Sequence, residues 1–279
     1  MTVPFQFTLG RNLHVTICPD RAQMGAAAAA LVQREVARAV AASGRSRIVF
    51  GCAPSQDEFF TALVGQAAGD PLPWTKTDVF HMDDYIGFDA SHPQSFRRYL
   101  NEHFLNRVNV AAFHPIQGEA TDPTAEAKRY DAVLRAAPID IVCLGFGENG
   151  HIAFNDPPVA DFDDPFRVKL VEIDEACRQQ QVNDGCFPSI VDVPRLAATI
   201  TLPVFAEAGM LCGVVPTRRK ARAVHDALLG PIGPACPASL LRTHPRAHLF
   251  LDPAAASLLP SSLTAQPTAT EHRILPVNS

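Results

Sequence analysis

The sequence predicts an α/β fold, Rossmann-like, with a mostly parallel, twisted sheet and helices on both of its faces. Short apolar runs alternate with longer amphipathic stretches along the chain, which is the pattern of strands joined by crossover helices. The run IDIVCLG at 139–145 is almost continuously apolar, as expected of a strand that is buried on both faces. Many of the 24 prolines stand where strands or helices would end. We expect a single domain over residues 1–252.

The elements follow in order from local signals. A helix is expected over 20–44, because Asp20 can cap its start and Gly44 can end it. Further helices are expected at 58–67, 95–105, 123–137 and 220–230. The expected strands are 47–50, 77–81, 139–145, 167–173, 198–202, 209–215 and 247–252. From residue 253 to 279 the chain is rich in Pro, Ala, Ser and Thr without periodicity, so we expect a loosely held tail.

Composition excludes several classes of partner. The net charge is −5 and the basic residues form no long run, so we expect no nucleic acid partner. The most apolar stretch, GAAAAALV at 25–32, is too short to cross a bilayer, and we expect no membrane contact. The seven cysteines form no CxxC pair, which favours reduced thiols and a cytoplasmic location.

Polar and glycine-rich motifs follow four of the expected strands. These motifs are GCAPSQDEF (51–59), HMDDYIG (81–87), GENGHIAFNDP (147–157) and VVPTRRK (214–220). In open parallel sheets, ligands bind beyond the carboxyl ends of the strands. The four motifs are therefore expected to form one site.

The block from IDIVCLG to GHIAFNDPP, together with HMDDYIG and VVPTRRKARAV, resembles the glucosamine-6-phosphate deaminase (isomerase) family. The related 6-phosphogluconolactonases share its general fold. The resemblance runs in order from about residue 45 to 252. It implies a phosphorylated sugar as substrate, no metal, no cofactor and a possible homo-oligomer.

The chemistry that the resemblance implies needs an acid and a base near neutral pH. The sugar ring opens, a proton moves from C2 to C1, and ammonia leaves, so that a ketose phosphate remains. Asp83 matches the carboxylate that moves this proton, and burial can raise the pKa of such a group toward the working pH. Asp84 beside it is a candidate substrate contact, with a cap or turn role as the alternative.

His151 matches the residue that opens the ring, since an imidazole with an ordinary pKa of about 6.5 can both give and take a proton. Asp156 lies where the family usually has a glutamate that supports this histidine. Asn149 stands where we expect an aspartate, so the charge partner of His151 is either Asp156 or Glu148. Gly150 is a further candidate for substrate contact.

The phosphate is expected to lie between two of the motifs. Ser55 and Gln56 begin a predicted helix, whose free N–H groups can hold a phosphate. Lys220 matches a family lysine that pairs with the phosphate. Arg178 lies near the family's second phosphate cation in sequence but out of register.

Two alternatives remain open from the sequence. A sugar-phosphate lactonase would use His151 to activate water, without exchange of a C2 proton. A binding protein that has lost turnover is the second alternative. It is favoured by Asn149 and by the stretch GCAPSQDEF at 51–59, which stands where typical family members have a Gly- and Thr-rich phosphate loop. Separately, His244 and His248 are unsuited to bind one metal from a helix, because Pro245 lies between them.

Overall fold

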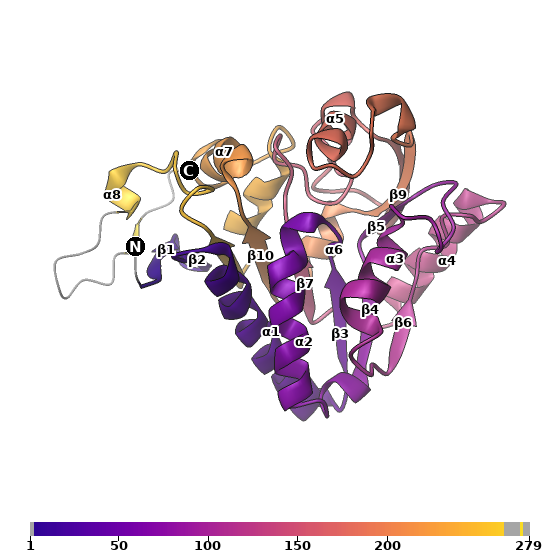
Figure 1. Cartoon of the computed structure of the whole chain (residues 1–279), viewed down its shortest axis with the longest axis horizontal. Helices are drawn as coiled ribbons and strands as arrows, with labels where there is room; N and C mark the ends of the chain where they lie inside the picture. The colour runs from indigo at the N-terminus through magenta and orange to yellow at the C-terminus, as the bar shows by residue number, and fades with distance from the viewer. Residues whose placement is uncertain (1–2, 265–273, 276–279) are drawn as a thin grey trace.

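The computed structural model describes residues 3–264 and 274–275. A central sheet lies between two layers of helices, as Figure 1 shows. Its nine strands have the order β12-β1-β2-β11-β10-β7-β3-β4-β6. The neighbours from β2 to β6 are all parallel, whereas β1 is antiparallel to β2 and parallel to β12. The predicted α/β fold with a mostly parallel sheet is confirmed.

The nine strands have the following bounds: β1 Phe5–Leu9, β2 Leu13–Ile17, β3 Ser46–Phe50, β4 Thr77–His81, β6 Ala112–His114, β7 Ile141–Leu144, β10 Leu211–Val215, β11 Ala247–Leu251 and β12 Ile274–Leu275. The α-helices are α1 Arg21–Ser43, α2 Asp57–Gly69, α3 Phe96–Leu100, α4 Pro123–Arg135, α5 Glu175–Asn183, α6 Leu202–Ala206, α7 Ala221–Leu229 and α8 Ser261–Thr264. No helix in these ranges is long and apolar enough to cross a membrane.

The ends of α1 confirm the predicted signals. The Asp20 carboxylate accepts a hydrogen bond from the Gln23 N–H at 2.7 Å, which satisfies one of the free donors in the first turn. Gly44 follows the helix with φ 80°, a left-handed conformation that favours glycine. The predicted helix at 95–105 is α3 continued by a π-helical turn, Asn101–Leu105.

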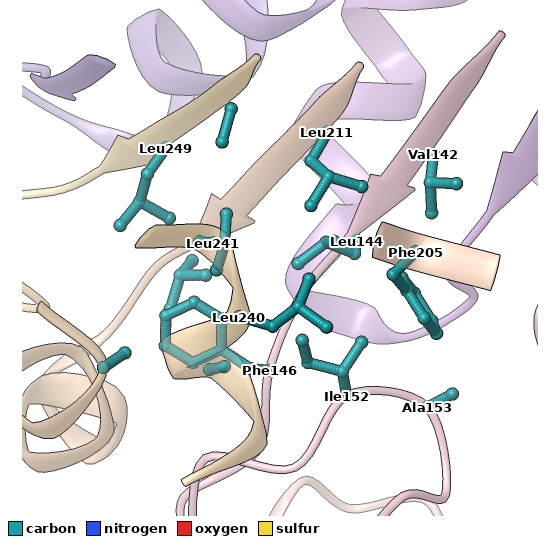
Figure 2. Packing of buried hydrophobic residues seen from close by; sticks show 14 of the residues in the cluster. Val142, Leu144, Phe146, Ile152, Ala153, Phe205, Leu211, Leu240, Leu241 and Leu249 are labelled. Atoms are coloured by element: carbon teal, nitrogen blue, oxygen red, sulfur yellow. The ribbon is translucent and has the colours of Figure 1, made fainter. Parts of the chain in front are cut away.

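The central strands are apolar on both faces because each face packs against helices. On β7, Ile141 and Cys143 belong to the cluster that contains side chains of α1 and α2. Val142 and Leu144 belong to the opposite cluster, which contains side chains of α4, α6 and α7. Figure 2 shows part of the second cluster, in which Val142 and Leu144 of β7 lie near Phe205 of α6. Leu211 of β10 and Leu249 of β11 belong to the same cluster. Successive residues of one strand therefore enter different cores.

Three strands form a second, antiparallel sheet with the order β5-β9-β8. They are β5 Asp83–Tyr85, β9 Leu196–Ile200 and β8 Val168–Glu172. The strands expected at 167–173 and 198–202 are present but lie outside the parallel sheet. Met82 joins the two sheets, because its N–H donates to the Phe50 carbonyl at 3.2 Å and its carbonyl accepts from the Ile200 N–H at 2.8 Å.

The sequence analysis did not predict β1, β2, β5, β6 or β12, which are short or alternate in polarity. The segment from residue 253, expected as a loosely held tail, begins with core residues: Ala255, Leu259 and Leu263 are buried. Residues 265–273 and 276–279 of that expected tail lie outside the described residues.

Gly25 allows α1 and α2 to approach closely. A Cβ atom at Gly25 would lie 2.5 Å from the backbone carbonyl carbon of Glu58 and 2.8 Å from the amide nitrogen of Phe59. Gly65 of α2 is exposed and has nothing within 4 Å of its Cβ position.

The two glycines should respond in opposite directions to alanine. Gly65→Ala should raise the free energy of unfolding by about 0.5–1 kcal/mol, because alanine is the better helix former. Gly25→Ala should lower it by about 1–3 kcal/mol, because the helices must separate. Urea unfolding of both variants measures the difference, and equal effects would contradict the close approach.

Candidate active site

The four predicted motifs come together at one edge of the central sheet. They follow β3, β4, β7 and β10, which are consecutive in the strand order β10-β7-β3-β4. A single pocket lies at their carboxyl ends and is lined by all four motifs. Its lining residues are Gly51, Cys52, Ala53, Ser55, Gln56, Met82, Asp83, Phe96, Gly145, Phe146, Gly147, His151, Ala153, Phe154, Gln180, Gln181, Asp184 and Lys220.

The GENGHIAF loop is anchored to the core at both ends of its turn. Phe146 and Ile152 are buried, and Figure 2 shows both among the core side chains below the strand ends. Between them, Gly150 has φ 82°, and its carbonyl accepts from the Ala238 N–H at 2.9 Å. Gly150 is absent from the pocket lining. Its positive φ turns the chain, and the expectation that it contacts the substrate stays a prediction.

Gly147 lies directly against the imidazole of His151. A Cβ atom at Gly147 would lie 2.2 Å from Cε1 and 2.4 Å from Nδ1 of this ring. No side chain fits between the two residues while the ring keeps its position. The first glycine of the motif thus makes room for the histidine.

His151 is buried and is held from behind by two polar side chains. Its Nδ1 lies 2.9 Å from Oδ1 of Asp156, although the N–H direction is poorly aligned with this oxygen. Asn149 accepts from the His151 N–H at 3.1 Å and donates to Asp156 Oδ1 at 2.9 Å. Of the two predicted charge partners, the structure selects Asp156, while the Glu148 N–H donates to Gln180.

Asp156 and Asn149 both contact His151 and are absent from the lining of this pocket. Burial by itself raises the pKa of Asp156. The contacts with His151 and then with Asn149 outweigh burial, and the pKa of Asp156 is below its usual value. The carboxylate is therefore kept ionised beside the imidazole.

Asp83 is the carboxylate that faces the pocket. It begins β5, opposite Thr199 of β9, where the chain leaves the parallel sheet. Only 6% of the residue is exposed. Burial and then the neighbouring Asp84 carboxylate raise the pKa of Asp83 well above its usual value.

Asp84 points away from the pocket, because successive side chains of a strand alternate. Its carboxylate accepts from Arg97 Nε at 3.0 Å, from Ser95 Oγ at 3.2 Å and from the backbone N–H groups of Tyr85 and Phe96. These contacts tie the strand to the start of α3 and favour the alternative, a cap or turn residue. That Asp84 contacts the substrate stays a prediction.

The side of the pocket formed by the motifs after β3 and β10 carries one lysine. Lys220 is 6% exposed, and burial lowers its pKa even though the charge of Asp184 acts in the opposite direction. Ser55 and Gln56 line the same pocket. Gln56 Nε2 donates to the Val214 carbonyl at 3.0 Å, which fixes its side chain next to the end of β10. These three predicted phosphate contacts therefore lie around one space.

Helix α5 and the residue that follows it contribute pocket residues that the sequence analysis missed. Gln180, Gln181 and Asp184 line the pocket, and Figure 1 shows α5 beyond the carboxyl ends of the strands. No motif or periodicity marked them, because the helix reaches the pocket only through the tertiary fold. Arg178 of the same helix donates to the Ile190 and Val193 carbonyls and is absent from the pocket lining.

Within residues 3–264, one cluster has the composition of a metal site: possible ligand atoms of His151, Asp156 and Cys177 lie within 4.8 Å of one another. However, His151 Nδ1 contacts Asp156 while Nε2 faces the Cys177 sulfur at 3.9 Å. The three side chains are thus already in contact with one another around the imidazole ring. The expectation of a metal-free site stays a prediction.

Comparison with known proteins identifies the family of this chain. Residues 19–165 match the model of a family described as glucosamine-6-phosphate isomerases/6-phosphogluconolactonase. A glucosamine-6-phosphate deaminase of Arthrobacter sp. is 34% identical over 256 residues, which are 88% of this chain and 93% of that protein. A second one, from Exiguobacterium sibiricum, is 36% identical over 64% of this chain and 69% of that protein.

Solved structures show the same relationship. A monomeric glucosamine-6-phosphate deaminase superposes with a TM-score of 0.81 at 26% identity, over 88% of this chain and 99% of that chain. The 6-phosphogluconolactonase of Thermotoga maritima has a TM-score of 0.67 at 14% identity, over 88% of this chain and 100% of that chain, which shows a shared fold alone. The chain belongs to the family of glucosamine-6-phosphate isomerases and 6-phosphogluconolactonases.

Proposed function

We propose that this protein is an enzyme that converts glucosamine 6-phosphate, or a close amino-sugar phosphate, to a ketose 6-phosphate and ammonia. One observation carries the proposal: Asp83 and His151 open into the same pocket, and Lys220 lines it as well. The pocket combines an acid, an imidazole and a cation, which suits proton transfer on an anionic sugar. The curated relatives carry the name of this activity.

His151 opens the sugar ring in this mechanism. Its imidazole gives a proton to the ring oxygen while the anomeric hydroxyl loses one, and a free aldehyde forms at C1. Asp156 stabilises the imidazolium at 2.9 Å, and Asn149 holds Asp156 in place. Asp156 and Asn149 thus take the roles that the family resemblance assigns to a glutamate and an aspartate.

Asp83 then moves the proton from C2 to C1. Its carboxylate takes the C2 proton, which leaves an enolamine, and the resulting carboxylic acid returns the proton to C1. Water adds to the C2 imine that forms, and ammonia leaves, so the net reaction consumes one water. A raised pKa suits both halves of this step, since Asp83 must accept a proton and then release it.

We place the phosphate between Lys220 and the start of α2. Lys220 supplies the charge, and Ser55 supplies a hydroxyl on the same pocket wall. Arg178 is bonded to backbone carbonyls and does not line the pocket. Among the described residues, Lys220 is the one lysine or arginine that does. A homo-oligomer stays a prediction.

The assay that tests the proposal is ammonia release from glucosamine 6-phosphate in heavy water. We expect ammonia together with deuterium at C1 of the ketose, because the proton on Asp83 exchanges with solvent. Galactosamine 6-phosphate and 6-phosphogluconolactone serve as comparisons. Hydrolysis of the lactone without ammonia from either amino sugar would contradict the deaminase and support the lactonase alternative.

Asp83→Asn should abolish turnover and stabilise the protein. The amide cannot carry the proton, so kcat should fall at least about 10³-fold while substrate still binds. The pKa of Asp83 is higher in the folded protein than the usual aspartate value, so this carboxyl favours folding at low pH and loses that contribution as the pH rises. At pH 7 the variant should therefore have a higher Tm. The increase should be about 2–4 °C for each kcal/mol gained in the free energy of unfolding.

Thermal unfolding of Asp83→Asn and of the parent at pH 4 and pH 7 checks this pH dependence of stability. The gain in Tm of the variant should be larger at pH 7. The parent enzyme should also lose kcat/KM on the acid side at a pH above the usual aspartate value. Full activity in Asp83→Asn would remove Asp83 from the mechanism.

Gly147→Ala should impair catalysis with little change in stability. The new methyl group would occupy the position of the His151 ring, and a displacement of about 1 Å can cost about 100-fold in rate. Steady-state kinetics should show a lower kcat with KM less affected. Gly65→Ala, which meets nothing within 4 Å, is the matched control, and equal kcat values for the two variants would contradict the role of Gly147.

A further inference from the structure

The loop between β10 and α7 contains a strained residue. Thr217 has φ 80° and ψ 149°, a conformation that β-branched residues rarely adopt. It lies three residues before Lys220, and its carbonyl accepts from the Lys220 N–H at 3.1 Å. The path of the chain from β10 to the lysine therefore depends on this conformation.

One carboxylate holds the strained peptide group in place. The Thr217 N–H is shared between Oδ1 and Oδ2 of Asp252, at 3.1 Å each. Asp252 Oδ1 also accepts from the Ala255 N–H at 2.7 Å. Asp252 is 6% exposed and directly follows β11, whose residue Leu251 pairs with Val215 of β10. The carboxylate thus connects the end of β11 to the lysine-bearing loop.

We infer that Asp252 is a positioning residue for the anion-binding end of the pocket. It lines no part of the pocket itself and acts through the backbone of Thr217 on Lys220. Without its two acceptor oxygens, Thr217 relaxes toward negative φ, and the turn that carries the lysine changes its course. This role rests on the proposed function, because it assigns the phosphate group of the substrate to Lys220.

The test compares Asp252→Ala, Thr217→Gly and the double variant. Calorimetric titration with inorganic phosphate measures the anion site, and steady-state kinetics with glucosamine 6-phosphate separate KM from kcat. Asp252→Ala should weaken phosphate binding and raise KM by about tenfold each, with kcat changed less than about threefold. Thr217→Gly should recover most of this loss in the double variant, since glycine adopts positive φ without strain.

The matched control is Asp122→Ala. Asp122 also accepts two backbone N–H groups, of Thr124 and Ala125 at the start of α4, but it is absent from the pocket lining. Its replacement should leave phosphate affinity within about twofold of the parent. If Asp252→Ala does not fold, Asp252→Asn keeps the size and one acceptor oxygen, and an intermediate loss of phosphate affinity is expected.

Unchanged phosphate affinity in a folded Asp252 variant would overturn the inference, as would a fall in kcat at constant KM or a double variant without recovery. If the parent enzyme releases ammonia but folded Asp252 variants bind phosphate as tightly as the parent, only the positioning role of Asp252 is overturned. A parent enzyme that neither binds phosphate nor releases ammonia would overturn the proposed function as well.

Discussion

The burial of the parallel sheet on both faces is the constraint on which the rest of the structure depends. Residues of β7 alternate between two apolar cores, so polar side chains cannot be accommodated along the strand without a partner. Chemistry is therefore confined to the ends of the strands. Because the strands are parallel, the carboxyl ends of β10, β7, β3 and β4 lie next to one another. Four distant motifs thereby share one pocket.

Within that pocket, the surroundings of each buried group determine its protonation. Asp83 and Asp156 are both nearly inaccessible carboxyls, yet their pKa values move in opposite directions. The difference is the partner: His151 and Asn149 contact Asp156, whereas Asp83 has the like charge of Asp84 as its neighbour. One carboxylate is thus suited to remain charged and the other to exchange a proton.

The fold class, the main helices and the strands of the sheet centre could be predicted because their signals are local. Capping by Asp20 and Gly44 and the continuous apolar run of β7 are properties of short segments. The separation of β8 and β9 into a second sheet could not be predicted. Strand periodicity shows that a segment is extended and which face is apolar, but it does not show which strand is its neighbour.

The sequence by itself determined which residue types lie at the strand ends, and Asp83, His151 and Lys220 do meet there. Only the tertiary structure decided the finer roles. Asp84, although adjacent to Asp83, points away from the pocket because of strand alternation, and Gly150, adjacent to His151, turns the chain with a positive φ. Gln180 and Asp252 join the site or support it from segments that no motif marks. The physical reason is that side-chain direction and long-range packing depend on the whole backbone, whereas residue type is already present in the chain.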